Sequence, residues 1–145
     1  MNMAHAARTT HVLLRVVAGV LLVQHGGQKL FGWFGGMGGV PGATVPLVSQ
    51  MGLAGVLEFF GGSAVALGLF TRPVAFLLSG ELAVAYFQSH LPNAFWPIQN
   101  HGELAALYSF VFLFLAANGA GGFSLDALRQ RGRAGTAGSL PGRRP

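Results

Sequence analysis

The chain contains no cysteine, few acidic residues and little charge of either sign. Only four of its 145 residues are Asp or Glu, and 9% are charged. The lack of cysteine excludes disulfides, thiolate metal sites, iron–sulfur clusters and thiol–disulfide exchange. A pI of about 11.2 does not indicate nucleic-acid binding, because the basic residues are few and gather near the C-terminal end rather than among exposed aromatic residues.

The chain is rich in hydrophobic residues, which make up 52% of the sequence, and its mean hydropathy is +0.53. Four apolar stretches cover about residues 11–30, 50–70, 73–91 and 101–118. Each approaches the roughly 20 residues that an α-helix needs to cross a bilayer. We therefore predict an all-α integral membrane four-helix bundle, in a single transmembrane domain over residues 1–128.

The region after the fourth stretch predicts a different environment. Ser124 and Asp126 are typical of the N-cap and first turn of a helix, so we expect a short cytoplasmic surface helix here. Residues 129–145 are rich in Gly and Arg, and we expect a disordered basic tail attracted to anionic lipid.

The distribution of charge predicts the topology. Arg8, Arg15 and Arg72 lie at one side of the predicted spans, whereas residues 31–49 and 88–100 contain no Lys, Arg, Asp or Glu. By the positive-inside rule both termini are cytoplasmic. A cleaved signal peptide is the alternative for residues 1–28, but the apolar run leads into QHGGQK rather than a small-residue cleavage site, so we favour an uncleaved span.

Three acidic residues lie within or at the edge of the apolar stretches: Glu58, Glu81 and Glu103. A charge in hydrocarbon costs about 2.5 kcal/mol or more, so each needs a partner, a proton or a function. Arg15 and Lys29 share one face of the first predicted helix.

These charges have two interpretations. In one, they form structural ion pairs that fix neighbouring helices, Arg15 with Glu81, and Glu58 or Glu103 with His25 or Lys29. In the other, His25, Lys29, Glu58 and Glu103 form a proton-handling or ligand-binding site that opens to the outer face.

Three histidines, His25, His90 and His101, lie near the outer ends of predicted spans. Two of them could ligate a haem or a metal, but no two have a recognised ligand spacing, so we predict no metal site. For His25 we also consider a hydrogen bond to a quinone head group. The sequence identifies no catalytic residue.

Several short segments resemble one family. They are HGGQKLFG at 25–32, EFFGG at 58–62, GLFTR at 68–72, NHGEL at 100–104 and GGFSLD at 121–126. In this order and at these span boundaries, the chain resembles the DoxX family of small bacterial membrane proteins over roughly residues 11–128. The resemblance implies a four-span protein of the bacterial inner membrane. The family takes its name from a subunit of a thiosulfate:quinone oxidoreductase, and some members are associated with oxidative-stress defence and redox partners.

The sequence leaves three functions open. The first is a redox-associated, quinone-linked subunit or oxidative-stress accessory, in which His25 or Lys29 binds a quinone oxygen and Glu58 or Glu103 exchanges the proton. The second is a non-catalytic scaffold that recruits a partner enzyme. The third is a small proton or solute transporter. Without cysteine, thiosulfate chemistry has no obvious sulfur-handling residue here.

Overall fold

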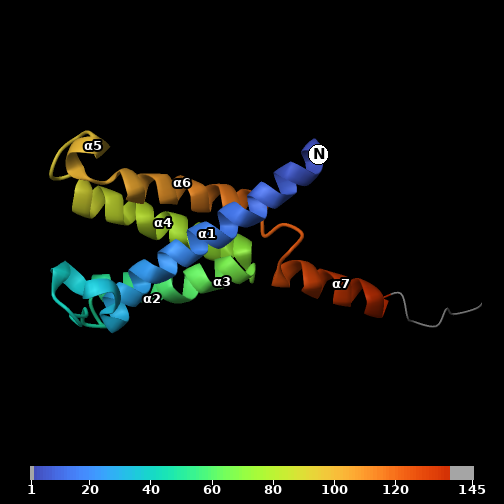
Figure 1. The fold of residues 1–145 in the computed structure, drawn as a ribbon, viewed down its shortest axis with the longest axis horizontal. Coiled ribbons are helices and arrows are strands. Elements are labelled where there is room, and N and C mark those ends of the chain that lie inside the picture. Colours follow the sequence, from blue (N-terminus) through green and yellow to red (C-terminus); the bar gives the residue numbers. More distant parts are fainter. Residues whose placement is uncertain (1, 138–145) are drawn as a thin grey trace, which may run out of the picture.

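The computed structural model describes residues 2–137, and all regular secondary structure within that range is helical (Figure 1). The α-helices are α1 (Met3–Phe31), α2 (Gln50–Val56), α3 (Gly62–Leu67), α4 (Thr71–Ala85), α5 (Pro97–Asn100), α6 (Glu103–Asn118) and α7 (Leu125–Ala137). Two short 3-10 turns, η1 (Trp33–Gly35) and η2 (Met37–Gly39), follow α1, and two π-helical segments, η3 (Leu57–Gly61) and η4 (Tyr86–His90), continue α2 and α4. The predicted all-α class is confirmed for these residues.

Helix α1 is the longest element and packs closely on the second apolar segment. It ends at Gly32, whose φ of 68° lies in the left-handed region that glycine adopts without strain. A Cβ on Gly26 would lie 2.4 Å from the backbone nitrogen of Phe59, and one on Gly19 would lie 2.7 Å from the carbonyl oxygen of Gly62. These glycines therefore allow the backbone of α1 to approach η3 and α3 closely.

The second apolar segment is one continuous run of α2, η3 and α3. It begins at Ser49, whose hydroxyl accepts a hydrogen bond from the amide of Gly52 at 3.0 Å. It ends at Gly68, which has a φ of 71°. The π-helical part includes Glu58, the acidic residue of this segment.

Helices α4 and α6 form the second closely packed pair. The hydroxyl of Ser79 donates to the carbonyl oxygen of Ser109 at 2.8 Å, which joins the two helices within the apolar region. The fully buried side chains of the core come from both pairs and include Leu22, Val65, Leu78, Phe112 and Leu115. The two pairs thus share one hydrophobic core.

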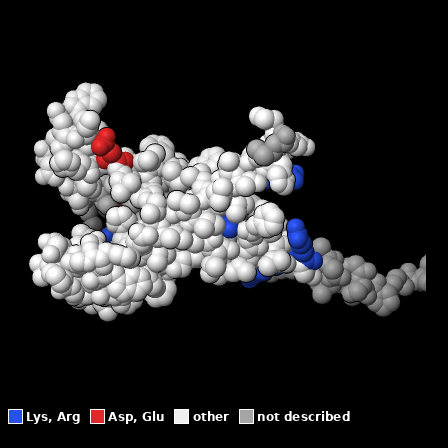
Figure 2. Space-filling model, viewed as in Figure 1, with Lys and Arg blue, Asp and Glu red and all other residues white. Residues whose placement is uncertain are grey.

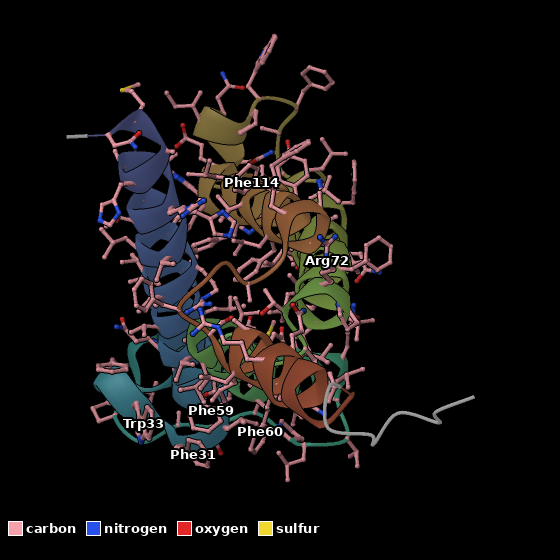
Figure 3. The ribbon with its side chains drawn as sticks, turned by 90° about the vertical axis from the view of Figure 1, so that its right-hand side faces the viewer. Phe31, Trp33, Phe59, Phe60, Arg72 and Phe114 are labelled. Carbon is pink, nitrogen blue, oxygen red and sulfur yellow. The ribbon has the colours of Figure 1, made fainter. Side chains whose placement is uncertain are left out.

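The pairs spread apart toward the end of the molecule that carries α5 and the 32–49 segment (Figure 1). At that end an aromatic cluster closes the join between α1 and η3. It consists of Phe31, Trp33, Phe59 and Phe60, with neighbouring ring centroids 5.1 to 5.7 Å apart (Figure 3). Of these residues, Trp33 is of the kind that is enriched at a membrane–water interface.

Helix α7 begins where the sequence predicts a helix. The hydroxyl of Ser124 accepts a hydrogen bond from the amide of Ala127 at 3.1 Å, as an N-cap does. The helix continues to Ala137, so residues 129–137, expected in a disordered tail, are helical in the structure. Leu, Ala, Arg and Gln, which are good helix formers, follow the capped start and favour the helix as far as Arg131, whereas Gly132 and Gly135 do not favour its continuation. Residues 138–145 of the expected tail lie outside the described residues.

Candidate functional site

A cavity of about 990 Å³ lies between the two helix pairs, at the end where they spread apart. Figure 2 shows the corresponding hollow at the left of the molecule, between the two arms. Most of its lining is apolar, from α1, α2, η3, α4 and α6. The polar lining consists of His25, Lys29, Ser49, Gln50, Glu58, Glu81, Gln88, Ser89, His90, His101 and Tyr108. A largely apolar cavity with a few polar groups is typical of a small-molecule site.

The charged centre of this cavity is the ion pair between Lys29 and Glu58. The ammonium of Lys29 donates to both carboxylate oxygens of Glu58, at 2.7 Å to Oε1 and 2.5 Å to Oε2. The two side chains are 13% and 5% exposed. Of the pairings that the sequence left open for Glu58, the structure therefore forms the one with Lys29.

The position of Glu58 follows from the local backbone. It lies in the π-helical segment η3, between the ordinary helices α2 and α3. A π-turn inserts extra backbone into a helix and changes the direction of the side chains around it, and such turns occur frequently at functional sites. The close approach at Gly26 places η3 against the last turns of α1, where Lys29 lies.

Glu81, on α4, lies across the cavity from this pair. Its Oε2 atom is buried and has no hydrogen-bond partner among the described residues. Its carboxyl group is close enough to Glu58 and Lys29 to interact with their charges. The cavity thus holds two carboxyl groups and one ammonium in an apolar setting, and the unpartnered carboxyl is stabilised there by a proton or by a ligand that donates a hydrogen bond.

Arg15 does not form the ion pair with Glu81 that the sequence predicted. Its guanidinium donates to the carbonyl oxygens of Ala120 at 2.5 Å and Phe123 at 2.8 Å, and the residue is 2% exposed. The loop after α6 folds back onto α1 and brings carbonyl groups without helical partners to the guanidinium. Two of the three guanidinium nitrogens of Arg15 are therefore held by backbone carbonyl groups, and its buried Nε has no partner among the described residues. Arg15 does not line the cavity.

Of the remaining predicted site residues, His25 lines the cavity and Glu103 does not. His25 lines the cavity and lies close enough to Glu58 to interact with its charge. Glu103 lies exposed in the first turn of α6 and outside the cavity lining. The structure therefore brings together His25, Lys29 and Glu58, replaces Glu103 by Glu81, and contains no group of three or more His, Asp or Glu side chains suited to a metal in residues 2–137.

Polar side chains line the mouth of the cavity. The amide of Gln50 on α2 donates to the amide oxygen of Gln88 on η4, which links the two helix pairs. The Nδ1 atom of His90 is 3.1 Å from the carbonyl oxygen of Asn100, and its ring stacks on Tyr86 at a centroid distance of 6.4 Å. The sequence analysis did not identify Gln50, although its position at the start of an apolar span was a signal.

Asp126 has a structural role that the sequence analysis did not foresee. Its two carboxylate oxygens accept hydrogen bonds from the amides of Phe70 and Thr71, each at 2.9 Å, so a residue of α7 caps the start of α4. Partial burial acts to raise the pKa of Asp126, but these backbone hydrogen bonds and the charge of Arg129 outweigh it and hold the pKa below its usual range. The carboxylate is therefore the form that joins α7 to α4.

The length and composition of the helices indicate a class of protein. Two helical segments, Met3–Phe31 and Gln50–Leu67, are long and apolar enough to cross a membrane, and α6 is a shorter apolar helix. By length and composition these segments fit a helical membrane protein, although the core helices of soluble proteins can pass the same test, so the comparisons with known proteins decide the class.

The comparisons with known proteins identify the family. The DoxX family model matches residues 10–91, more than half of the chain, and the chain belongs to the DoxX family. An uncharacterized protein of Haemophilus influenzae is 43% identical over 116 residues, which are 78% of this chain and 85% of that protein. The inner membrane protein YqjF of Escherichia coli is 29% identical over 126 residues, 81% of this chain and 89% of that protein. No solved structure matches the chain.

Proposed function

We propose that the chain is a four-span protein of the bacterial inner membrane with both termini in the cytoplasm. The name of the Escherichia coli relative supports the membrane, and the packing of two helix pairs supports four crossings. The positions of Arg8 and Arg72, and the uncharged 32–49 and 88–100 segments, support the orientation. In this orientation the cavity opens toward the outer face.

We further propose that the cavity binds the head group of a quinone. The observation that carries this proposal is the unpartnered carboxyl group of Glu81 beside the Lys29–Glu58 pair, in an apolar cavity of about 990 Å³. A quinone presents carbonyl oxygens that accept hydrogen bonds, on an apolar ring with an apolar tail. The Lys29 ammonium or the His25 ring donates to one carbonyl oxygen, and protonated Glu81 donates to the other.

The residues of the cavity supply protons and not electrons. Reduction of a quinone to a quinol takes up two electrons and two protons. Glu81 transfers one proton to one reduced oxygen and is reprotonated from the water at the mouth of the cavity. The Lys29 ammonium, which donates to the other oxygen, stabilises the negative charge there until water supplies the second proton. The electrons come from a redox partner protein, which makes the chain the quinone-linked membrane subunit of an oxidoreductase or an accessory in oxidative-stress defence.

A second candidate function is a non-catalytic scaffold. Helix α7 extends away from the helix pairs and carries the exposed basic residues Arg129 and Arg131 (Figure 1). A projecting arm of this kind suits recruitment of a partner enzyme. In this case the Lys29–Glu58 pair serves only to hold α1 beside η3.

Purification in a mild detergent separates the two candidates. Mass spectrometry and visible spectroscopy of the purified protein identify what remains bound. The quinone proposal predicts a bound quinone that is depleted in the Glu81→Leu variant, which lacks the hydrogen-bond donor, and retained in the control variant Glu103→Leu, whose position lies outside the cavity lining. A protein partner without quinone favours the scaffold instead.

A further inference from the structure

A second cavity lies at the opposite end of the molecule from the proposed quinone site and shares no residue with it. It has a volume of about 680 Å³ and lies between the connection from α3 to α4, the loop after α6 and the first turns of α7. We propose that it is a binding site for the phosphate head group of an anionic phospholipid. The proposal does not depend on the function of the quinone cavity.

Two guanidinium groups with unused donors line this cavity, Arg72 and Arg129. Nη1 of Arg72 donates to the carbonyl oxygen of Ala117 at 2.7 Å, and its Nε and Nη2 atoms have no hydrogen bond to any described residue. The guanidinium of Arg129 lies 4.5 Å from the ring centroid of Phe70, and among residues 2–132 it makes no hydrogen bond or ion pair. Arginine suits a phosphate group because its planar fork donates two parallel hydrogen bonds.

The loop of residues 119–123 adds backbone donors. Its carbonyl groups are used by α1: His11 donates to Gly119 at 2.9 Å, and Arg15 donates to Ala120 and Phe123. By contrast, the amides of Gly121 and Gly122, which line the cavity, have no backbone partner within the described part of the chain. A fourth carbonyl group of the loop, that of Gly121, accepts a hydrogen bond from the Ser124 hydroxyl at 2.8 Å. With four of its five acceptors occupied, the loop can offer the cavity the amides of Gly121 and Gly122, as anion-binding loops do.

One carboxylate, Asp126, also lines the cavity. Both of its oxygens already accept hydrogen bonds from the amides of Phe70 and Thr71, and its charge interacts with that of Arg129. Asp126 therefore fixes α7 and its arginine in place. The two guanidiniums still give the cavity an excess of positive charge.

The surroundings favour a lipid over a free phosphate ion. The cavity lies where the apolar segments end, at Leu67 and Asn118, so its depth matches that of a head group. The apolar side chains of Phe70, Phe123 and Leu128 are exposed around it and are available to acyl chains. Figure 2 shows basic residues at this end of the molecule, and Figure 3 shows Arg72 at the end that faces the viewer. A phosphate with attached hydrocarbon satisfies both kinds of surface, which an inorganic ion does not.

The test measures binding of phosphatidylglycerol to the purified protein in a neutral detergent by native mass spectrometry, with phosphatidylcholine as the zwitterionic comparison. We expect Arg129→Gln to weaken phosphatidylglycerol binding roughly five-fold, and Arg72→Gln by a similar factor, since each arginine loses a phosphate contact. The matched control Arg131→Gln removes an exposed arginine of the same helix that does not line the cavity, and should change binding less than two-fold, about the limit of the measurement.

Three results would overturn the proposal: an equal loss in Arg131→Gln, equal binding of phosphatidylcholine, or displacement of the lipid by inorganic phosphate at a comparable concentration. The first would mean diffuse charge attraction, and the last a site for a soluble anion. Arg72→Gln also removes a bond to the end of α6 and can disturb folding. Arg129→Gln removes no such bond, so its result decides the question by itself.

Discussion

Lys29, in the last turns of α1, donates to both carboxylate oxygens of Glu58 in the π-helical segment η3, at 2.7 and 2.5 Å. The two residues are 29 positions apart in the chain, and this buried pair joins two apolar segments and forms the charged centre of the cavity between the helix pairs. Because the pair is almost fully removed from solvent, the charge of each partner is stabilised mainly by the charge of the other. Removing one leaves an uncompensated charge.

The pair predicts a non-additive pattern in a double-mutant cycle. Lys29→Met alone strands the Glu58 carboxylate and should destabilise the protein by about 3–5 kcal/mol. The double variant Lys29→Met with Glu58→Gln removes both charges and should be more stable than the single variant. Thermal unfolding in detergent measures both. Strictly additive losses would show that the two residues do not interact.

The close approach of α1 to η3 predicts a specific steric effect. A Cβ at position 26 would lie 2.4 Å from the backbone nitrogen of Phe59, so Gly26→Ala forces the helices apart. We expect a loss of about 1–3 kcal/mol in the free energy of unfolding. Gly80→Ala is the control, because no atom lies within 4 Å of its Cβ position, and it should be neutral or stabilising by up to about 1 kcal/mol. Equal effects of the two variants would contradict the packing.

Asp126 predicts a pH dependence at the junction of α7 and α4. Its pKa is lower in the folded protein than in the unfolded chain, so its stabilising contribution is present above the usual value of about 3.9 and is lost as the pH falls through the folded pKa. Asp126→Ala should destabilise this junction by about 1 kcal/mol, as loss of an N-cap does. Limited proteolysis of the 119–124 loop at pH 7 and near pH 3 measures the effect. The variant should be cut more readily than the wild type at pH 7, and the difference should shrink as the pH falls, because the wild type then loses the carboxylate. A difference that does not change with acid would contradict the proposed role of Asp126.

The proposed topology predicts the location of two loops. Gly36 lies in the 32–49 segment and Asn93 lies in the 88–100 segment, and both should reach the periplasm. Fusions of alkaline phosphatase at these positions should be active, and fusions of green fluorescent protein should be dark. A cytoplasmic result at either position would rule out the four-span arrangement.

Much of the helical framework could be predicted from the sequence, because long apolar runs with polar ends leave few alternatives. The third predicted span, 73–91, corresponds to α4 and η4 over residues 71–90, and the fourth, 101–118, to α6 over Glu103–Asn118. Lys29 and Glu58 could be named as candidates because buried charges need partners. Which of several candidates meet depends on helix rotation, which the sequence does not specify.

The contacts that the sequence predicted wrongly or did not reveal have a common physical origin. Arg15 binds carbonyl groups 105 and 108 residues away, and backbone carbonyls leave no mark on side-chain composition. Asp126 caps a helix that begins 55 residues earlier, although its sequence neighbours indicate only its own helix. The π-turn at Glu58 has no simple sequence signature either, and it determines which residues face the cavity. Local patterns predict local structure, whereas these contacts depend on tertiary packing.

The most direct test of the quinone site is the affinity of the purified protein for a short-chain ubiquinone, compared between the wild type and Glu81→Leu. Leucine is close in size to glutamate and removes the hydrogen-bond donor, whereas glutamine would still donate through its amide. Because one oxygen of the Glu81 carboxyl is buried without a partner, the substitution breaks no hydrogen bond at that atom and should leave the unfolding temperature unchanged within a few degrees. We predict that this variant binds the quinone about ten-fold more weakly, the effect of losing a hydrogen bond of about 1.4 kcal/mol, whereas Glu103→Leu binds as the wild type does. A folded Glu81→Leu variant with wild-type affinity, or a wild type that binds no quinone, would contradict the account.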